Sequence, residues 1–170
     1  MQQYGTVAIE GNVASLLFER YLPHSPERVW RALTSPEELA EWYDAHQATI
    51  DGREGGSIEM VAGPARFHWT GKILVWEPHS VLEYEFNTPP HSHLPSGENT
   101  IIRYELREAD GGTSLTLKHS LLTKMTALGF APGTHALLDR LSAHLSSDTL
   151  PDFFSRYKEV QSGYPSWRAQ

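Results

Sequence analysis

A stripe of leucines in the last quarter of the chain constrains the fold most. Leu137, Leu138, Leu141 and Leu145 recur at the spacing of one face of an α-helix. An apolar helix face must be buried, and the only large partner that this chain offers is a sheet formed by the residues before it. We therefore expect a helix packed on an antiparallel sheet, with any functional site between them.

The C-terminal region is predicted to be helical from 131 to 160, as one long helix or as two with a bend. Pro132-Gly133 marks the expected start, with Thr134 as the N-cap. Asp148 is expected to cap the second stretch, and Pro151 falls in its first turn, where a missing N–H costs little. The apolar positions of this second stretch are Leu150, Phe153, Phe154, Tyr157 and Val160.

Length and composition indicate one domain over residues 1–170, with its core within about 14–160. The net charge of −7 is spread along the chain, which argues against a nucleic-acid partner because phosphate binding needs a clustered basic face. The absence of cysteine excludes disulfides, thiolate zinc sites and cysteine nucleophiles, and it fits a cytoplasmic protein. No apolar run approaches ~20 residues, so no membrane span is expected.

The N-terminal part is predicted to begin with an irregular lead-in over 1–12, followed by a strand over Val13–Leu22. Arg20 shares the apolar face of this strand with Leu16, Phe18 and Leu22. An arginine at such a position is paired with an acid, lies at a strand edge, or contacts a ligand.

Two short helices are expected after this strand. Ser25 is a good N-cap with Pro26 at the first helical position, and Ser35 with Glu38 forms a capping-box pattern. The predicted buried residues are Val29, Trp30, Leu33, Leu39 and Trp42.

The middle of the chain alternates apolar and polar residues, as a meander of antiparallel strands does. The expected strands are Ala48–Ile50, Ser57–Val61, Arg66–Trp76, Val81–Phe86, Ile101–Glu108 and Ser114–Leu121, with Leu121 facing inward. Gly71 predicts a bend or the close approach of another backbone. The proline-rich segment Thr88–Asn99 is expected to be a disordered loop.

Four motifs resemble one known family. They are SPERVWRALTSPEELAEWYDA (Ser25–Ala45), EGGSIEM (Glu54–Met60), GKILVWEPHSVLEYEF (Gly71–Phe86) and GGTSLTLKHSLL (Gly111–Leu122). In this order they resemble the START-like (SRPBCC) superfamily, and within it the family named for homology to the activator of the Hsp90 ATPase. The resemblance implies an α+β helix-grip fold, a curved antiparallel sheet of about seven strands around a long C-terminal helix. It also implies an apolar cavity, since relatives bind hydrophobic small molecules or assist a chaperone ATPase, and more distant ones cyclise polyketides.

Histidines supply the candidates for chemistry. His119 is expected to face inward beside Tyr104, where the two would act as acid and base, or else His119 is a hydrogen-bonded core residue. His91 and His93 share one side of an extended segment but lack a third ligand nearby, so no metal is expected. His135 and Asp139 have the spacing of a surface hydrogen bond on a helix.

Inward-facing aromatic residues favour an apolar ligand, because an empty pocket of ~300 Å³ would cost about 7 kcal/mol. The expected ligand-binding residues are Arg20, Trp42, Phe67, Trp69, Tyr84, Phe86, Tyr104, His119, Leu138 and Leu141. The leading hypothesis is the binding of a hydrophobic small molecule, without a cofactor. The alternatives are a cyclase or dehydratase using His119 and Tyr104, and a co-chaperone that binds a protein partner.

Overall fold

The computed structural model describes residues 3–90 and 96–166, and over these it contains one eight-stranded antiparallel sheet and four helices. The strands are β1 (Thr6–Glu10), β2 (Val13–Leu22), β3 (Ala45–Ile50), β4 (Ser57–Ala62), β5 (Phe67–Glu77), β6 (Val81–Thr88), β7 (Glu98–Ala109) and β8 (Gly112–Thr123). The helices are α1 (Pro26–Thr34), α2 (Pro36–Trp42), α3 (Lys124–Leu145) and α4 (Phe153–Gln161). The predicted helix-grip architecture is confirmed, with eight strands in place of about seven.

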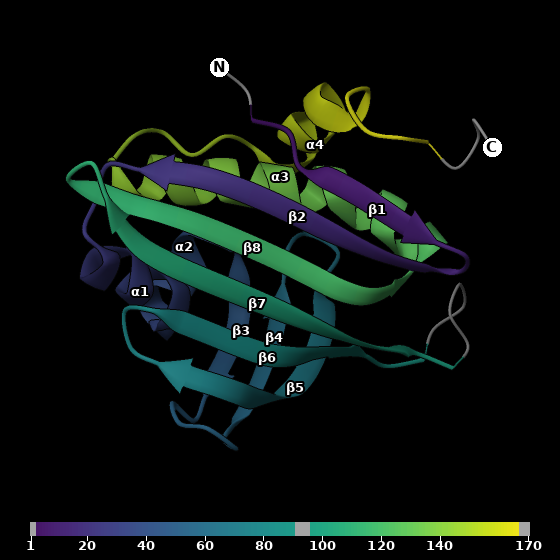
Figure 1. Ribbon diagram of the computed structural model, residues 1–170, viewed down its shortest axis with the longest axis horizontal. Coiled ribbons are helices and arrows are strands. Elements are labelled where there is room, and N and C mark those ends of the chain that lie inside the picture. Colours follow the sequence, from purple (N-terminus) through teal and green to yellow (C-terminus); the bar gives the residue numbers. More distant parts are fainter. Residues whose placement is uncertain (1–2, 91–95, 167–170) are drawn as a thin grey trace.

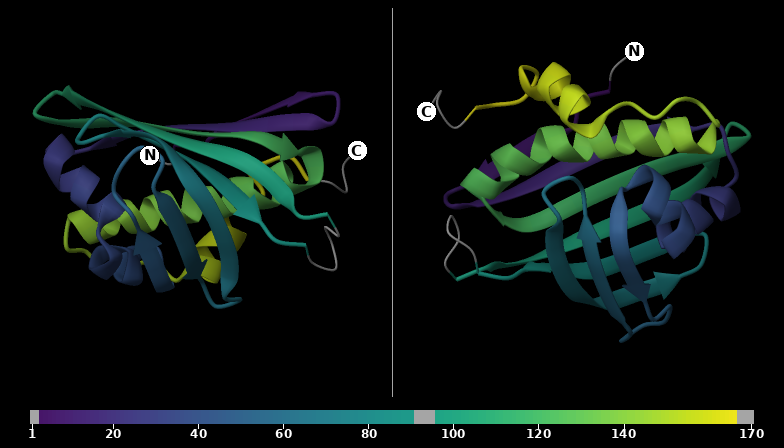
Figure 2. Two further views of the ribbon diagram at one scale, coloured as in Figure 1. Left: turned by 90° about the horizontal axis from the view of Figure 1, so that it is seen from below. Right: turned by 180° about the vertical axis from the view of Figure 1, so that it is seen from behind.

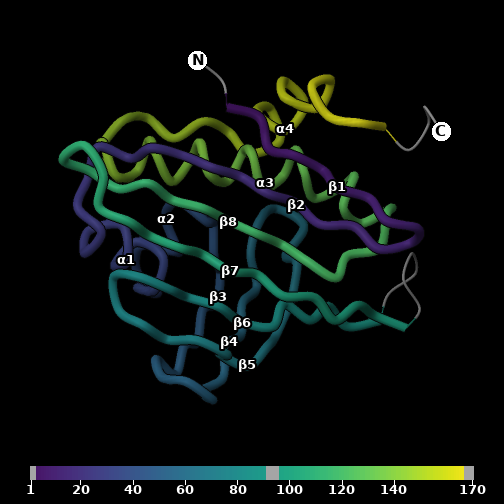
Figure 3. The backbone as a smooth tube through the Cα atoms, in the orientation of Figure 1, coloured from purple at the N-terminus to yellow at the C-terminus, as the bar shows by residue number. Residues whose placement is uncertain are grey.

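The strand order is β1-β2-β8-β7-β6-β5-β4-β3, and all neighbours are antiparallel. The chain meanders from β3 to β8 and then enters α3, while β1 and β2 extend the sheet on the other side of β8 (Figure 3). The sheet curves around α3, and α1 and α2 cover the C-terminal end of that helix (Figures 1 and 2). Helix α4 packs against α3. This arrangement buries the apolar stripe of α3, as its periodicity predicts.

The lead-in predicted to be irregular instead contains a strand. Residues Thr6–Glu10 form β1, which pairs with β2 through the turn at Gly11. Gly11 has a φ of 63°, a left-handed conformation that glycine adopts without steric cost and that a tight hairpin requires. The short run of β1 shows no clean alternation of apolar and polar residues, so its pairing with β2 was not visible in the sequence.

Helix α3 begins at Lys124, well before the predicted start at Thr134. Its N-cap is Thr123, whose side chain accepts a hydrogen bond from Thr126 N at 3.3 Å. The buried Glu98 adds a second cap from β7, because its Oε1 accepts from Thr123 N at 2.7 Å and from Thr126 Oγ1 at 2.9 Å. A cap supplied from 25 residues away in the chain leaves no local sequence signal.

Pro132 lies inside α3 and does not begin it. A proline in a helix interior removes one backbone hydrogen bond and disturbs the preceding turn. In that turn the Gly129 carbonyl accepts a hydrogen bond from the Tyr157 hydroxyl of α4 at 3.0 Å. Contact with α4 therefore supports α3 where the sequence predicted a helix boundary.

The C-terminal region forms two separate helices, one of the two predicted alternatives. Asp152, and not Asp148, is the N-cap of α4, and its carboxylate accepts from Ser155 N at 3.0 Å. Asp148 belongs to the turn after α3, where its N–H donates to Ala143 O at 2.8 Å. Pro151 consequently precedes the N-cap of α4 and lies outside the first helical turn.

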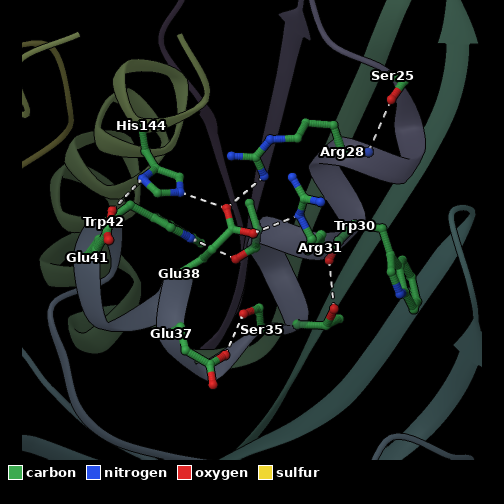
Figure 4. A network of polar contacts seen from close by, with 12 residues as sticks. Ser25, Arg28, Trp30, Arg31, Ser35, Glu37, Glu38, Glu41, Trp42 and His144 are labelled. Atoms are coloured by element: carbon green, nitrogen blue, oxygen red, sulfur yellow. Dashed lines mark hydrogen bonds and ion pairs between the residues drawn. The ribbon is translucent and has the colours of Figure 1, made fainter. Parts of the chain in front are cut away.

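The predicted N-cap at Ser25 is confirmed, but the capping box at Ser35 is wrong. The Ser35 hydroxyl bonds the Glu37 carboxylate at 2.9 Å and makes no cap hydrogen bond. Glu38 turns away and bonds Arg28 at 2.7 Å, Arg31 at 3.1 Å and His144 at 2.8 Å (Figure 4). Glu38 therefore joins α1, α2 and the end of α3. Burial opposes its ionisation, but the hydrogen bonds from His144 and Arg28 outweigh burial and lower the pKa of Glu38.

Leu121 faces solvent, contrary to the prediction that it faces inward. It is 56% exposed and has a φ of 64°, while its neighbour Leu122 is buried. The pairing of β8 with β2 shifts register at this point, between Ala14 and Leu16. An extra residue in one strand of a pair reverses the alternation of side chains beyond it. Leu122 therefore faces inward in place of Leu121.

Gly71 confirms the predicted close approach of another backbone. A Cβ atom at this position would clash with the Glu85 carbonyl oxygen of β6. The missing side chain therefore allows β5 and β6 to approach each other, and it does not enlarge the space in front of the sheet.

Arg20 is paired with an acid. Its Nη1 lies 2.7 Å from Asp139 Oδ1, and Asp139 Oδ2 lies 2.7 Å from Arg156 Nε and 3.4 Å from His135 Nε2. His135 and Asp139 are paired as their helical spacing predicts, but His135 is fully buried, so its predicted surface location is wrong. Burial opposes ionisation of Asp139, but hydrogen bonds from His135, Arg156 and Arg20 hold its pKa well below the usual range. One carboxylate thus connects β2, α3 and α4.

We predict that Asp139→Asn lowers the free energy of unfolding by about 3 kcal/mol, because it leaves the buried Arg20 guanidinium without a counter-charge. Urea denaturation at neutral pH measures this change. The control is Asp51→Asn, which removes the partner of Arg53 in an exposed ion pair and is expected to change stability by less than about 0.5 kcal/mol. Equal effects of the two substitutions would contradict a central role for Asp139.

Candidate functional site

An open pocket of about 200 Å³ lies between the concave face of the sheet, the middle of α3 and the start of α4. Its walls are mainly aromatic and aliphatic. The aromatic residues that border it are Tyr43, Phe67, Trp69, Phe86, Phe130, Phe153 and Phe154. The polar residues that border it are Asp44, His119, Thr134 and Arg140. An apolar lining with a few polar groups is typical of sites for small organic molecules.

The rings on β5 and β6 form one continuous surface. Trp69 stacks on Tyr84 with a centroid distance of 5.2 Å and an interplanar angle of 7°, and it contacts Phe86 at 4.6 Å. Phe67 stacks on Phe86 at 6.0 Å, and Phe130 of α3 meets Phe86 edge-on at 5.8 Å. Alternate strand residues share one face, so the period of two in the sequence places these rings together.

The middle of α3 leaves space for the pocket because it carries small side chains there. Gly133 and Thr134 border the pocket, and Leu137 follows one turn later. Arg140 closes the side nearest α2, where its guanidinium donates to Trp42 O at 2.8 Å, Pro151 O at 2.5 Å and Glu41 O at 3.1 Å. Arg140 thus holds α2 and the segment before α4 against α3 and fixes the pocket rim.

His119 of β8 forms part of the pocket wall and is only 3% exposed. Its ring stacks on Phe130 at 5.6 Å and meets Phe86 edge-on at 5.2 Å. Its Nε2 lies 2.7 Å from the Thr100 hydroxyl. Burial disfavours the charged imidazolium and lowers the pKa of His119 to about 3, so the ring is neutral at physiological pH.

Three tyrosines gather beside the pocket, of which Tyr84 and Tyr104 are buried and Tyr43 is half-buried. Burial raises the pKa of Tyr43 to about 12, and the indole of Trp69 opposes this rise. Burial also raises the pKa values of Tyr84 and Tyr104, whose hydroxyls interact with each other. All three are therefore neutral phenols at physiological pH, and of the three only Tyr43 borders the pocket.

The structure separates the residues expected to bind a ligand into two groups. The expected residues that border the pocket are Phe67, Trp69, Phe86 and His119. The expected residues that do not border it are Arg20, Trp42, Tyr84, Tyr104, Leu138 and Leu141. Those of the second group other than Arg20 are buried in the core, and Arg20 lies in the ion-pair network.

Several pocket residues had no signal in the sequence. Tyr43 and Phe130 lie just outside the helices predicted there, and Arg140 and Phe153 reach the rim through the packing of α4 on α3. Leu137 and Leu138 both belong to the leucine stripe. Leu138 was predicted to bind the ligand, but Leu137 borders the pocket and Leu138 lies in the core. A helical stripe shows which side of a helix is buried, and it does not distinguish the residue facing the core from the one facing a pocket.

The structure does not place His119 and Tyr104 as direct cross-strand partners. In the pairing of β7 with β8, His119 lies opposite Ile102 and Tyr104 lies opposite Leu117. His119 bonds Thr100, whereas Tyr104 interacts with Tyr84. The two candidate residues therefore have separate hydrogen-bond partners.

Within residues 3–90 and 96–166, no cluster of three or more histidine, aspartate or glutamate side chains is suited to hold a metal ion. His91 and His93, which the sequence analysis considered as ligands, lie outside the described residues. In the same part of the chain, no helix is long and apolar enough to cross a membrane.

We predict that His119 makes stability fall as the pH is lowered. The unfolded histidine titrates near 6.5 and the folded one near 3, so the unfolded state binds more protons between these values. The free energy of unfolding should therefore decrease by up to about 1.4 kcal/mol for each pH unit below 6.5 through this residue. In His119→Leu, the free energy of unfolding measured with urea should fall less steeply between pH 6.5 and 4.5, and the difference from wild type should be up to this amount per pH unit.

Thr88→Val provides the control for this measurement, because it replaces a buried side chain without removing an ionisable group. Thr88→Val should keep the wild-type slope. If His119→Leu also keeps that slope, the acid sensitivity arises elsewhere and His119 is not held neutral by burial.

A family model described as "Activator of Hsp90 ATPase homolog 1-like protein" matches residues 23–146 of this chain. No curated protein matches it.

Among solved structures, CalU16 from Micromonospora echinospora has a TM-score of 0.72 at 20% identity, covering 96% of this chain and 94% of CalU16. The protein encoded by gene BPP1335 from Bordetella parapertussis has a TM-score of 0.71 at 25% identity, covering 96% of this chain and 90% of that one. A conserved protein of unknown function, EF2215 from Enterococcus faecalis, has a TM-score of 0.69 at 21% identity, with coverages of 95% and 92%. These similarities extend over nearly the whole of each structure and support the fold.

Proposed function

The chain belongs to the family of Activator of Hsp90 ATPase homolog 1-like proteins, and on this basis we propose that it binds a small aromatic molecule in the pocket between the sheet and α3. The family supports a ligand-binding domain in general. The lining of the pocket supports the narrower chemical class, because most of its walls are rings.

The observation that carries this proposal is the geometry of the aromatic surface. Phe67, Phe86 and Phe130 present faces and edges at centroid distances between 5.8 and 6.0 Å, which are favourable distances for aromatic contact. A flat ring inserted here would meet both the sheet and α3. Ordinary aliphatic chains would gain burial but not these ring contacts.

The size of the pocket limits the ligand to about one or two rings. An engineered protein cavity of about 150 Å³ binds benzene, and the pocket here has about 200 Å³ with an opening to solvent. A bicyclic aromatic with about 12 non-hydrogen atoms, at about 0.6 kcal/mol per atom, would bind with a Kd on the order of 10 μM. Larger molecules would extend past the rim formed by Asp44 and Phe154.

A protein-binding role is the second candidate, and a different observation favours it. Leu121 and Met125 are 56% and 69% exposed at the junction of β8 and α3. Exposed apolar side chains that lie close together are a common feature of protein-interaction surfaces. This surface lies apart from the pocket, so the two roles are separately testable.

The cytoplasmic location stays a prediction.

We predict that Thr134→Trp abolishes binding of 2-methoxynaphthalene, because the indole would occupy the pocket that Thr134 borders. Isothermal titration calorimetry of the wild type should show saturable binding, and the variant should bind at least about 10-fold more weakly. Met125→Trp places the same side chain at an exposed position on the same helix and should bind as the wild type does.

Thermal unfolding of both variants establishes that each is folded. Binding by Thr134→Trp that equals that of Met125→Trp would place the ligand outside this pocket. A wild-type protein that binds no aromatic probe would contradict the proposed function and leave the protein-binding candidate.

A further inference from the structure

The hydrogen bonds around His119 determine which ring nitrogen carries its proton. The Thr100 hydroxyl lies 2.7 Å from the Phe86 carbonyl oxygen and 2.7 Å from His119 Nε2. A carbonyl oxygen can only accept, and a hydroxyl has a single proton to donate. Thr100 therefore donates to Phe86 and must accept from His119, so the hydrogen of the neutral ring is on Nε2.

The other ring nitrogen, Nδ1, is consequently a lone-pair acceptor. No residue within 3–90 or 96–166 forms a hydrogen bond with it. The side chain borders the pocket and is held between Phe86 and Phe130, so the ring cannot turn freely to exchange its nitrogens. An acceptor in the pocket wall that has no partner in the protein is bonded either by water or by a donor on a molecule in the pocket.

The other polar groups at the pocket do not provide the same function. Three N–H groups of Arg140 are bonded to backbone carbonyls at the rim. The Trp69 indole is buried and interacts with the Tyr43 hydroxyl, and its N–H can only donate. His119 therefore offers a neutral acceptor in the wall of the pocket.

We propose that His119 Nδ1 selects ligands that carry a hydrogen-bond donor, such as a phenolic hydroxyl or a ring N–H, over aromatic molecules of the same size without one. This proposal rests on the proposed function, because it requires that the pocket binds aromatic molecules. It adds the polar group that such a ligand must present and the atom that recognises it. The low pKa of His119 agrees with it, because a protonated ring would have no acceptor to offer.

The test compares two probes that share a bicyclic ring, 2-naphthol with a hydroxyl donor and 2-methoxynaphthalene without one. Isothermal titration calorimetry at pH 7 should give a Kd for 2-naphthol that is roughly 3- to 10-fold lower, as expected for one neutral hydrogen bond. In His119→Leu the ratio of the two Kd values should fall to about one, because neither probe then meets an acceptor at this position. Equal affinities of the wild type for the two probes, or a preference that persists in His119→Leu, would overturn the proposal.

A second pair of variants tests the role of Thr100 if His119→Leu does not fold. Thr100→Val removes the acceptor that fixes the tautomer and should reduce the preference for 2-naphthol, whereas Thr100→Ser keeps the hydroxyl and should retain it. The ¹⁵N spectrum of the histidine rings in the unmodified protein should show the His119 proton on Nε2. A proton on Nδ1 would overturn the proposal directly.

The outcomes separate this inference from the proposed function on which it rests. If the wild type binds both naphthalenes equally, the pocket binds aromatic molecules and the selection by His119 is wrong. If the wild type binds neither, the proposed function is wrong and the selection falls with it.

Discussion

The ion pair between Asp139 and Arg20 is the interaction on which the arrangement of layers depends. Hydrophobic burial favours contact between helix and sheet but does not by itself select one position of the helix, because it has no direction. The Asp139 carboxylate removes that freedom, since it bonds Arg20 of β2 at 2.7 Å and Arg156 of α4 at 2.7 Å. Its neighbour His135 continues the network, with its Nδ1 2.7 Å from the Tyr164 hydroxyl, which accepts from Gly5 N at 2.8 Å. Both ends of the described chain are thus connected to one turn of α3.

A second set of polar contacts fixes the opposite side of α3. Glu38 connects α1 and α2 to His144, and Arg140 bonds backbone carbonyls of α2 and of the segment before α4. Just before these anchor points α3 carries Gly133 and Thr134, which border the pocket. The polar bonds thus hold α3 in place on both sides, while its small residues Gly133 and Thr134 border the pocket.

The interior of the pocket also has few polar groups. Its aromatic walls provide apolar contact, which does not orient a ligand, and His119 adds a hydrogen-bonding group, which does. The direction comes from Thr100, whose hydroxyl has only one proton and gives it to the Phe86 carbonyl. A backbone carbonyl of β6 therefore determines, through one hydroxyl, which nitrogen of a β8 side chain is available in the pocket. Tyr84 and Tyr104 lie buried and neutral outside the pocket lining, so they add no charge to this environment.

The sequence by itself determined the fold class, the order of most strands and the rings that the sheet turns inward. It did so because an alternation of period two and a stripe at helical spacing are local patterns, and because four motifs carried the family resemblance. It placed Phe67, Trp69, Phe86 and His119 on the face that borders the pocket. The tertiary structure decided the rest, namely the start of α3 at Lys124, the pairing of β1 and the contribution of Phe130 and Phe153 to the pocket. These features depend on Glu98 as a remote cap, on the hydrogen bond from Tyr157 to the turn before Pro132, and on the polar contacts that hold α3. Bonds between distant parts of the chain leave no periodic pattern in the sequence.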